Sequence, residues 1–169
     1  MLTARKAWQA VEQAAIALSG LPTDLQAQIV SVTVAGSLVR GDFIENNSDV
    51  DVYTVLKGDP NSPVWLKAHE AVRACFEQQL SRYKGYSHNP FVWDDVLVSS
   101  AKLPSTVEEV GNQRLKAFGV YLFDLIENHR TIFGEDFVER LPPHPNPRSL
   151  LFRRVQHLHE RAAMAVNDA

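Results

Sequence analysis

Hydrophobic residues recur at three- and four-residue steps in four segments of the chain, which is the spacing of one face of an α-helix. We therefore expect one helix ending near Gly20, a second over residues 63–80, a third over residues 105–125 and a last one from about residue 149. The residues of these stripes are Trp8, Val11, Ala15, Leu18, Trp65, Ala68, Val72, Phe76, Leu80, Leu115, Phe118, Leu122, Leu125, Leu151, Val155, Leu158, Ala162 and Val166. Two helix start signals support the second and third of these helices. Ser62 is a capping residue before a first-turn proline, Pro63, and Ser105 is expected to form a capping box with Glu108.

Three other segments predict strands. Residues 29–35 alternate in polarity and are rich in β-branched side chains. Residues 49–56 form a second hydrophobic run, which a Gly-Asp-Pro sequence then breaks. Residues 91–100 follow the turn-rich segment 85–90 and predict the third strand. Helices and strands together indicate the α+β class.

The chain is expected to divide into two unequal parts. The segment 132–136 is expected to end the folded unit, and the proline-rich stretch after it predicts a stiff linker. We therefore expect a domain over residues 1–141 and a linker with one C-terminal helix over residues 142–169. The apolar face of that helix needs cover, either from its own domain, from a second copy of the chain or from a helical protein partner.

Composition narrows the classes of partner and location. The chain has 169 residues, 45% of them hydrophobic, which is enough for one core. Its formal net charge is −3, so a grip on long nucleic acid, which usually needs a basic excess, is not expected. The single cysteine, Cys75, excludes an intramolecular disulfide. No stretch has membrane-spanning length and the start is typical of an amphipathic helix, so cytoplasmic location is the default expectation.

The segment from Val34 to Leu56 carries the chemistry. Asp49 and Asp51 are one residue apart at the start of a strand, so their side chains point the same way. Two adjacent carboxylates repel each other unless a cation lies between them. Gly36 permits close approach of the backbone to a ligand, and Ser37 can open a helix whose amides face a phosphate. Together these features predict a site for a nucleoside triphosphate and a divalent metal.

Other readings of the charged and polar residues have less support. The acidic stretch 45–51 lacks the central glycine and distal glutamate of a calcium loop, and a Gly-Lys-Ser/Thr phosphate loop is absent. The six histidines show no zinc-binding pattern, and no nucleophile triad has local support. Arg40 can steer a triphosphate or pair with Asp42 at the surface, and surface pairing is favoured. Asp124 and Glu127 lie three apart on a predicted helix and can reach the acceptor site or lie on a solvated helix face, and the solvated face is favoured.

The residues Gly36-Ser37, Arg40-Gly41 and Ser48-Asp49-Val50-Asp51-Val52 resemble the motif of the polymerase-beta-like nucleotidyltransferase superfamily. The resemblance is to small bacterial members, of the aminoglycoside-modifying type and of the minimal type found in toxin–antitoxin pairs. It departs from the family pattern at Leu38, where a polar residue is common, and in a loop about one residue longer. The segment 132–142 gives a second, looser match. The resemblance implies a small mixed β-sheet with helices packed on it.

The resemblance also implies a third carboxylate on a neighbouring strand, just before apolar residues. Asp94 and Asp95 are the candidates, and at most one can join the site because neighbouring residues of a strand face opposite sides. Asp95 directly precedes Val96-Leu97-Val98 and fits the family pattern better. Asp94 is the alternative.

The function implied by the resemblance is transfer of an NMP from an NTP to a hydroxyl, with release of pyrophosphate. Two Mg²⁺ ions, or Mn²⁺ in their place, would lie on Asp49, Asp51 and Asp95. The NTP, expected to be ATP, would contact Gly36, Ser37, Arg40 and Ser48. The acceptor is expected to be a small molecule or a protein.

Two alternatives stay open at this point. The chain can be an antitoxin-like module that binds a helical partner in a toxin–antitoxin pair, or a degenerate relative that binds nucleotide without turnover. The identity of the acceptor and the preferred base follow from no motif in the sequence.

Overall fold

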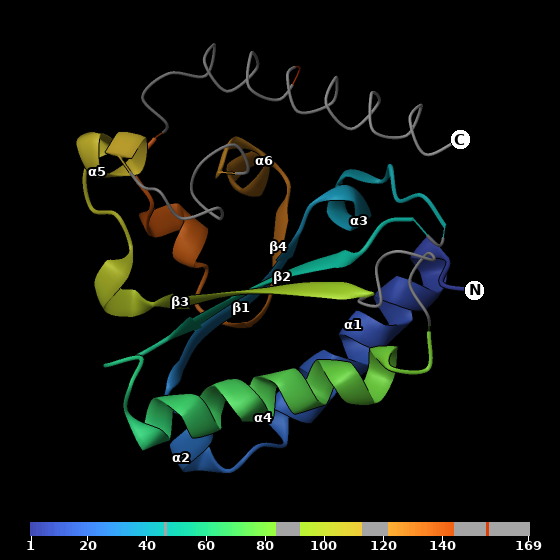
Figure 1. Ribbon diagram of the computed structural model, residues 1–169, viewed down its shortest axis with the longest axis horizontal. Helices are drawn as coiled ribbons and strands as arrows, with labels where there is room; N and C mark the ends of the chain where they lie inside the picture. The colour runs from blue at the N-terminus through green and yellow to red at the C-terminus, as the bar shows by residue number, and fades with distance from the viewer. Residues whose placement is uncertain (46, 84–91, 113–121, 144–154, 156–169) are drawn as a thin grey trace, which may run out of the picture.

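Four strands form one mixed sheet in the order β3-β2-β1-β4 (Figure 1). They are β1 (Ile29–Ala35), β2 (Val50–Leu56), β3 (Trp93–Ser99) and β4 (His129–Gly134). β1 runs antiparallel to β2 and β4, whereas β2 and β3 are parallel. The computed structural model describes residues 1–45, 47–83, 92–112, 122–143 and 155. The α+β class expected from the sequence is confirmed.

The central strands match their predicted ranges closely. All seven residues of β1 are buried, because this strand lies inside the sheet and is covered on both faces. β2 begins at Val50, directly after Asp49, and six of its seven residues are buried. Side chains at alternate positions of a strand face opposite sides of the sheet, so each strand contributes to two cores.

Strand β4 was not predicted. The segment 132–136 was expected only to end the folded unit, but residues 129–134 pair with β1 along the sheet edge. The chain turns at Gly134, whose φ of +78° suits glycine, and a Cβ there would lie 2.1 Å from the carbonyl oxygen of Val30. The strand is short and half exposed, so its hydrophobic pattern is weak, and pairing with β1 decides its conformation.

Two long helices cover one face of the sheet (Figure 1). They are α1 (Ala4–Ser19) and α4 (Pro63–Leu80), with the short α2 (Thr23–Gln26) beside α4. The predicted cap is present, because Ser62 accepts a hydrogen bond from the amide of Trp65. The α4 stripe predicted from periodicity is entirely buried.

The buried face of α1 is rotated from the predicted one. Its buried residues are Ala7, Ala10, Val11, Ala14 and Leu18. Trp8, expected to be central, is only half-buried and lies under the guanidinium of Arg130, 5.0 Å from the ring centroid. Alanines count little in a hydrophobic pattern, yet three of them face the interior and allow close packing.

The opposite face carries α6 (Leu122–Glu127) and the 3₁₀ turn η2 (Phe137–Arg140) (Figure 1). The short helix α3 (Ser37–Arg40) follows β1 and contacts α1. A second core forms on the face of α6 and η2 from Tyr53 and Val55 of β2 with Leu125 and Phe137. A 3₁₀ turn η1 (Ser100–Lys102) follows β3 directly, and helix α5 (Val107–Asn112) comes after it.

The N-terminal cap of helix α5 lies one residue later than expected. Thr106 Oγ1 accepts from the amide of Glu109 at 3.1 Å, and Glu109 accepts in return from the amide of Thr106 at 3.3 Å. The capping box is therefore Thr106 with Glu109, and the predicted box of Ser105 with Glu108 was wrong by one position. Ser105 contributes as well, since its amide and hydroxyl both donate to Glu109.

Several expectations fall on residues outside the described ranges. They are the loop 85–90, the part of the third stripe that contains Leu115 and Phe118, and the C-terminal helix apart from Val155. The division of the chain at residue 141 and any partner of the last helix therefore stay predictions. None of the helices in the described ranges is long and apolar enough to cross a membrane.

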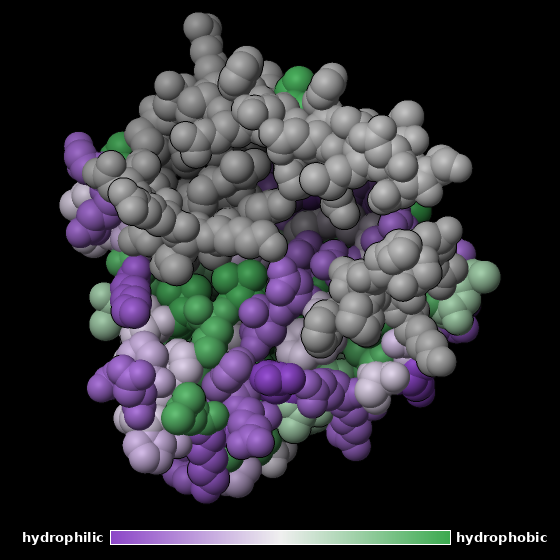
Figure 2. All heavy atoms as spheres, in the orientation of Figure 1, coloured by the Kyte–Doolittle hydropathy of each residue, from purple (hydrophilic) through white to green (hydrophobic). Residues whose placement is uncertain are grey.

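The outer face of α4 mixes hydrophilic and hydrophobic side chains (Figure 2). Val64 and Leu66 are each more than half exposed there. Single apolar residues scattered on a surface are ordinary and indicate no partner.

Candidate active site

One row of the sheet brings the acidic residues together. Asp51 of β2 lies opposite Asp94 of β3 on one side and opposite Ala35 of β1 on the other. Residues paired across neighbouring strands project from the same face of a sheet. Asp94 and Asp51 therefore share the face that carries α6, next to the turn that follows Ala35.

Asp95 lies on the other face. Its Oδ1 accepts a hydrogen bond from Thr54 Oγ1 at 2.8 Å, and its Oδ2 lies 2.6 Å from Nε2 of His69 in α4. The expectation that Asp95 joins Asp49 and Asp51 is therefore wrong, and the alternative, Asp94, is on their side. Strand register, rather than the apolar run after Asp95, decides which carboxylate faces the site.

Asp51 is the electrostatic centre of the row. The pKa of its carboxyl is raised from 3.8 to about 7, mainly by burial and also by the negative charges of Asp49, Asp94 and Asp124. The guanidinium of Arg40 opposes this rise only in part. Several carboxylates around one buried carboxylate produce a field that attracts cations.

The donor set suits Mg²⁺ as an ion shared with substrate. Among the described residues, no group of three or more His, Cys, Asp or Glu side chains is arranged so that it could hold a metal ion. Mg²⁺ usually takes only one or two protein carboxylates and fills its other positions with water and phosphate oxygens. Asp49 and Asp51, with Asp94 on the same face, can supply such a partial set.

Gly36 connects the carboxylates to the turn after β1. Its φ is +73°, and a Cβ at this position would lie 1.9 Å from Oδ2 of Asp51. Only glycine tolerates both the backbone conformation and this approach. Helix α3 starts at the next residue, Ser37, so the Ser37 side chain and the following amides begin beside the carboxylate row.

Leu38 departs from the family pattern for a structural reason. Its side chain is 3% exposed and belongs to the core formed with α1 and α4. A hydrophobic residue here anchors α3 to the sheet.

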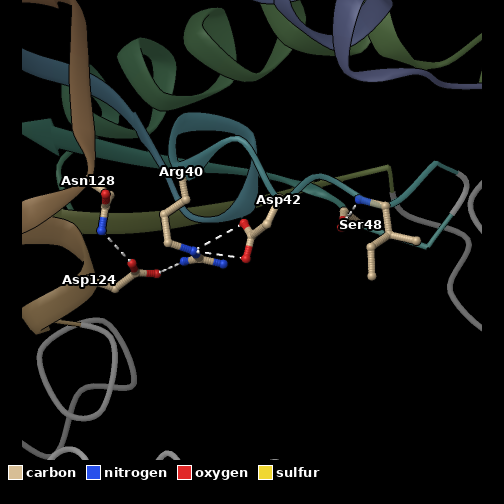
Figure 3. Close-up of polar contacts among 6 residues, drawn as sticks. Arg40, Asp42, Ser48, Asp124 and Asn128 are labelled. Carbon is tan, nitrogen blue, oxygen red and sulfur yellow. Dashed lines mark hydrogen bonds and ion pairs between the residues drawn. The ribbon is translucent and has the colours of Figure 1, made fainter.

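Arg40 lies between two carboxylates (Figure 3). Its Nε donates to Asp42 at 3.1 Å, which confirms the expected pairing, and its Nη1 donates to Asp124 of α6. Asp124 also accepts from Nδ2 of Asn128 at 3.0 Å. Asp124 is 7% exposed, so the expectation of a solvated position was wrong. No local sequence pattern links residues 40 and 124. The ion pair between them becomes visible only in the tertiary structure, where α6 lies beside the end of α3.

Ser48 closes the loop before the acidic strand (Figure 3). Its Oγ accepts a hydrogen bond from the amide of Ile44 at 3.0 Å, and its own amide donates to the carbonyl of Ile44 at 2.9 Å. These hydrogen bonds fix the backbone conformation of the loop that leads into Asp49. In the structure the Ser48 hydroxyl thus supports the loop, and its predicted contact with nucleotide is untested.

The sequence matches the nucleotidyltransferase domain family over residues 18–145. The chain belongs to this family. Its members' defining activity is nucleotidyl transfer, so the carboxylate row and the Gly36 turn are the candidate active site of a nucleotidyltransferase. No curated protein matches the sequence.

Two solved structures are similar to the nucleotidyltransferase at low identity. A structure of a toxin–antitoxin with AMP-PNP is 13% identical, with 99% of this chain and 98% of that chain covered and a TM-score of 0.34. A structure described as that of a nucleotidyltransferase from Sulfolobus solfataricus is 21% identical, with 59% and 68% covered and a TM-score of 0.27.

The contact between Gly36 and Asp51 predicts that Gly36→Ala destabilises the nucleotidyltransferase more than Gly41→Ala does. Both glycines have positive φ, but a Cβ at Gly41 would meet nothing within 4 Å. We expect a loss of about 1 kcal/mol for Gly41→Ala and of at least about 2 kcal/mol for Gly36→Ala, measured by chemical denaturation. Equal losses would contradict the close approach.

The raised pKa of Asp51 predicts pH-dependent stability in metal-free protein. A carboxyl whose folded pKa is about 7 rather than 3.8 destabilises the fold progressively as pH rises between these values. Asp51→Asn removes this charge, so the variant should match the wild type near pH 4. At pH 8 in EDTA it should be more stable by on the order of 1–4 kcal/mol. Thermal unfolding at both pH values checks this, and a less stable variant at pH 8 would refute it.

Proposed function

We propose that this nucleotidyltransferase transfers AMP from ATP to a hydroxyl of a small-molecule or protein acceptor and releases pyrophosphate. The observation that supports the proposal is the pairing of Asp51 with Asp94 on one face of the sheet, beside the Gly36-Ser37 turn, with the charge of Asp49 close enough to raise the pKa of Asp51. A polyphosphate next to several carboxylates requires a cation between them, which makes the reaction dependent on Mg²⁺.

Asp49 and Asp51 would hold Mg²⁺, together with Asp94 in place of the Asp95 expected from the sequence. When bound, Mg²⁺ supplies charge neutralisation at the phosphates and favours ionisation of the attacking hydroxyl. Asp51 is partly buried and lies between β1 and β3 in the sheet. Asp94 is exposed on the edge strand β3 and is accessible to an acceptor.

The turn after β1 would bind the phosphates. Gly36 lets the backbone come close, and the amides and hydroxyl that follow, from Ser37 on, can donate to phosphate oxygens. Arg40 lies at the end of the same short helix and supplies a positive charge. Binding at these groups would orient the α-phosphorus toward Asp94.

The bond changes balance within this set of groups. The acceptor oxygen attacks the α-phosphorus in line, and the bond from that phosphorus to the oxygen bridging to the β-phosphate breaks. Pyrophosphate leaves with the bonding electrons, and the hydroxyl proton passes to a base, for which Asp94 is the accessible carboxylate.

The neighbouring residues Asp94 and Asp95 provide a matched test. Asp49→Asn, Asp51→Asn and Asp94→Asn should each lower transfer of label from α-labelled ATP by at least about a hundredfold, because each removes a charge from the reacting centre. Asp95→Asn should keep transfer within a few-fold and lose about 1–2 kcal/mol of stability, because Asp95 bonds Thr54 and His69 on the opposite face.

Each variant should be compared with the wild type by thermal unfolding, so that loss of activity is separated from loss of fold. Retained activity in Asp94→Asn with loss in Asp95→Asn would overturn the assignment. If none of these variants lost activity, the row of Asp49, Asp51 and Asp94 would have no part in the mechanism.

The acceptor and the preferred nucleobase of the NTP are best identified by transfer of label. Each of the four NTPs, labelled at the α-phosphate, is incubated with aminoglycosides, tRNA or lysate proteins and Mg²⁺. We expect label from ATP on a small molecule or a protein and none on tRNA, because the chain has no basic excess. Calorimetric binding of ATP without pyrophosphate release would instead favour a nucleotide-binding protein without turnover.

A further inference from the structure

We infer that Asp124 and Asp42 control nucleotide binding in opposite directions through Arg40. Asp124 is a positioning residue that holds the guanidinium next to the phosphate turn. Asp42 occupies the edge of the same guanidinium that a polyphosphate would take. This inference rests on the proposed function, because it names how that site selects a triphosphate.

The two carboxylates differ in how firmly they are held. The Asp124 side chain is 8% exposed and accepts a hydrogen bond from Asn128, which directly follows α6, whereas the Asp42 side chain is 62% exposed and lies in a loop. A buried carboxylate that accepts hydrogen bonds from two side chains keeps its position when a ligand binds. An exposed carboxylate gives little stability and exchanges readily with water or another anion.

The guanidinium divides its donors unequally between the two partners. Nη1 donates to Asp124, and Nε is shared between both oxygens of Asp42, at 3.1 and 3.3 Å. Nη2 has no hydrogen bond to any of the described residues. Phosphates pair best with two parallel N–H groups on one edge of a guanidinium. The edge formed by Nε and Nη2 is that pair, and Asp42 uses only half of it.

The location of Arg40 makes this edge relevant to nucleotide. Arg40 ends the short helix that begins after Gly36, so its side chain belongs to the same turn as the candidate phosphate-binding groups. Its positive charge lowers the pKa of Asp51, so it acts within the field of the carboxylate row. Replacing Asp42 by a phosphate would leave the Asp124 contact unchanged and satisfy both edge donors (Figure 3).

A simple effect of charge would give a different result. Asp42 and Asp124 each place one negative charge beside Arg40, so removal of either charge should tighten binding of an anion if only the field mattered. Positioning instead predicts tighter binding without the Asp42 carboxylate and weaker binding without the Asp124 carboxylate.

The test compares Asp124→Asn with Asp42→Asn by calorimetry with ATP and with AMP, both in Mg²⁺, and by steady-state kinetics. Asp124→Asn should weaken ATP binding about tenfold and raise KM for ATP, with little change in kcat, since one oriented charge-assisted contact is lost. Asp42→Asn should tighten ATP binding by about two- to fivefold, because a competing anion is removed. AMP binding should change less than ATP binding in both variants.

Asn128→Ala is the second positioning variant. It keeps every charge and removes one hydrogen bond to Asp124, so it tests positioning even if Asp124→Asn folds poorly. We expect it to weaken ATP binding in the same direction as Asp124→Asn, by about two- to fivefold.

The outcomes separate this inference from the proposed function. Wild-type protein that binds no ATP overturns both. Wild-type protein that binds ATP and transfers AMP, with Asp124→Asn and Asp42→Asn shifting ATP affinity in the same direction, overturns the inference alone. Equal changes in the affinities for ATP and AMP also overturn it. AMP lacks the outer phosphates that the Arg40 guanidinium would contact, so the two nucleotides must respond differently.

Discussion

The approach of Gly36 to the Asp51 carboxylate is the contact on which the candidate site depends. Antiparallel pairing of β1 and β2 places Ala35 opposite Asp51, so the chain must turn directly over the carboxylate. Space for only a hydrogen at this position, combined with positive φ, requires glycine. The same geometry brings the short helix α3, which begins at Ser37 and ends at Arg40, beside the acidic row. Phosphate-binding and cation-binding groups therefore share one short piece of backbone.

Charge makes this arrangement unfavourable for the empty protein. Burial and three nearby carboxylates raise the pKa of Asp51 to about 7, and Arg40 compensates only in part. Folding keeps these groups together because hydrophobic cores on both faces of the sheet hold the strands in register. The stored repulsion favours any ligand that brings positive charge, so the cost to stability and the proposed affinity for Mg²⁺ have the same physical origin.

The neighbouring aspartates Asp94 and Asp95 lie on opposite faces of the sheet and have different surroundings. Asp94 is exposed on the acidic face, while its neighbour Asp95 is enclosed on the other by Thr54 and His69. The Asp95 contacts join β3 to β2 and α4, and so help to fix the strand on which Asp94 lies. A structural role for one carboxylate thus supports the proposed chemical role of the next.

Much of this protein follows from its sequence alone. Local patterns determined β1, β2 and α4 almost to the residue, and the motif from Gly36 to Asp51 indicated the family and predicted that two carboxylates share one face. Patterns of this kind are local, because period, capping and turn chemistry act over a few residues. Only the tertiary structure decided the strand β4, the choice between Asp94 and Asp95, and the pairing of Arg40 with Asp124. Each depends on the register or packing of segments far apart in the chain, and a shift of one residue reverses which side chains face the site.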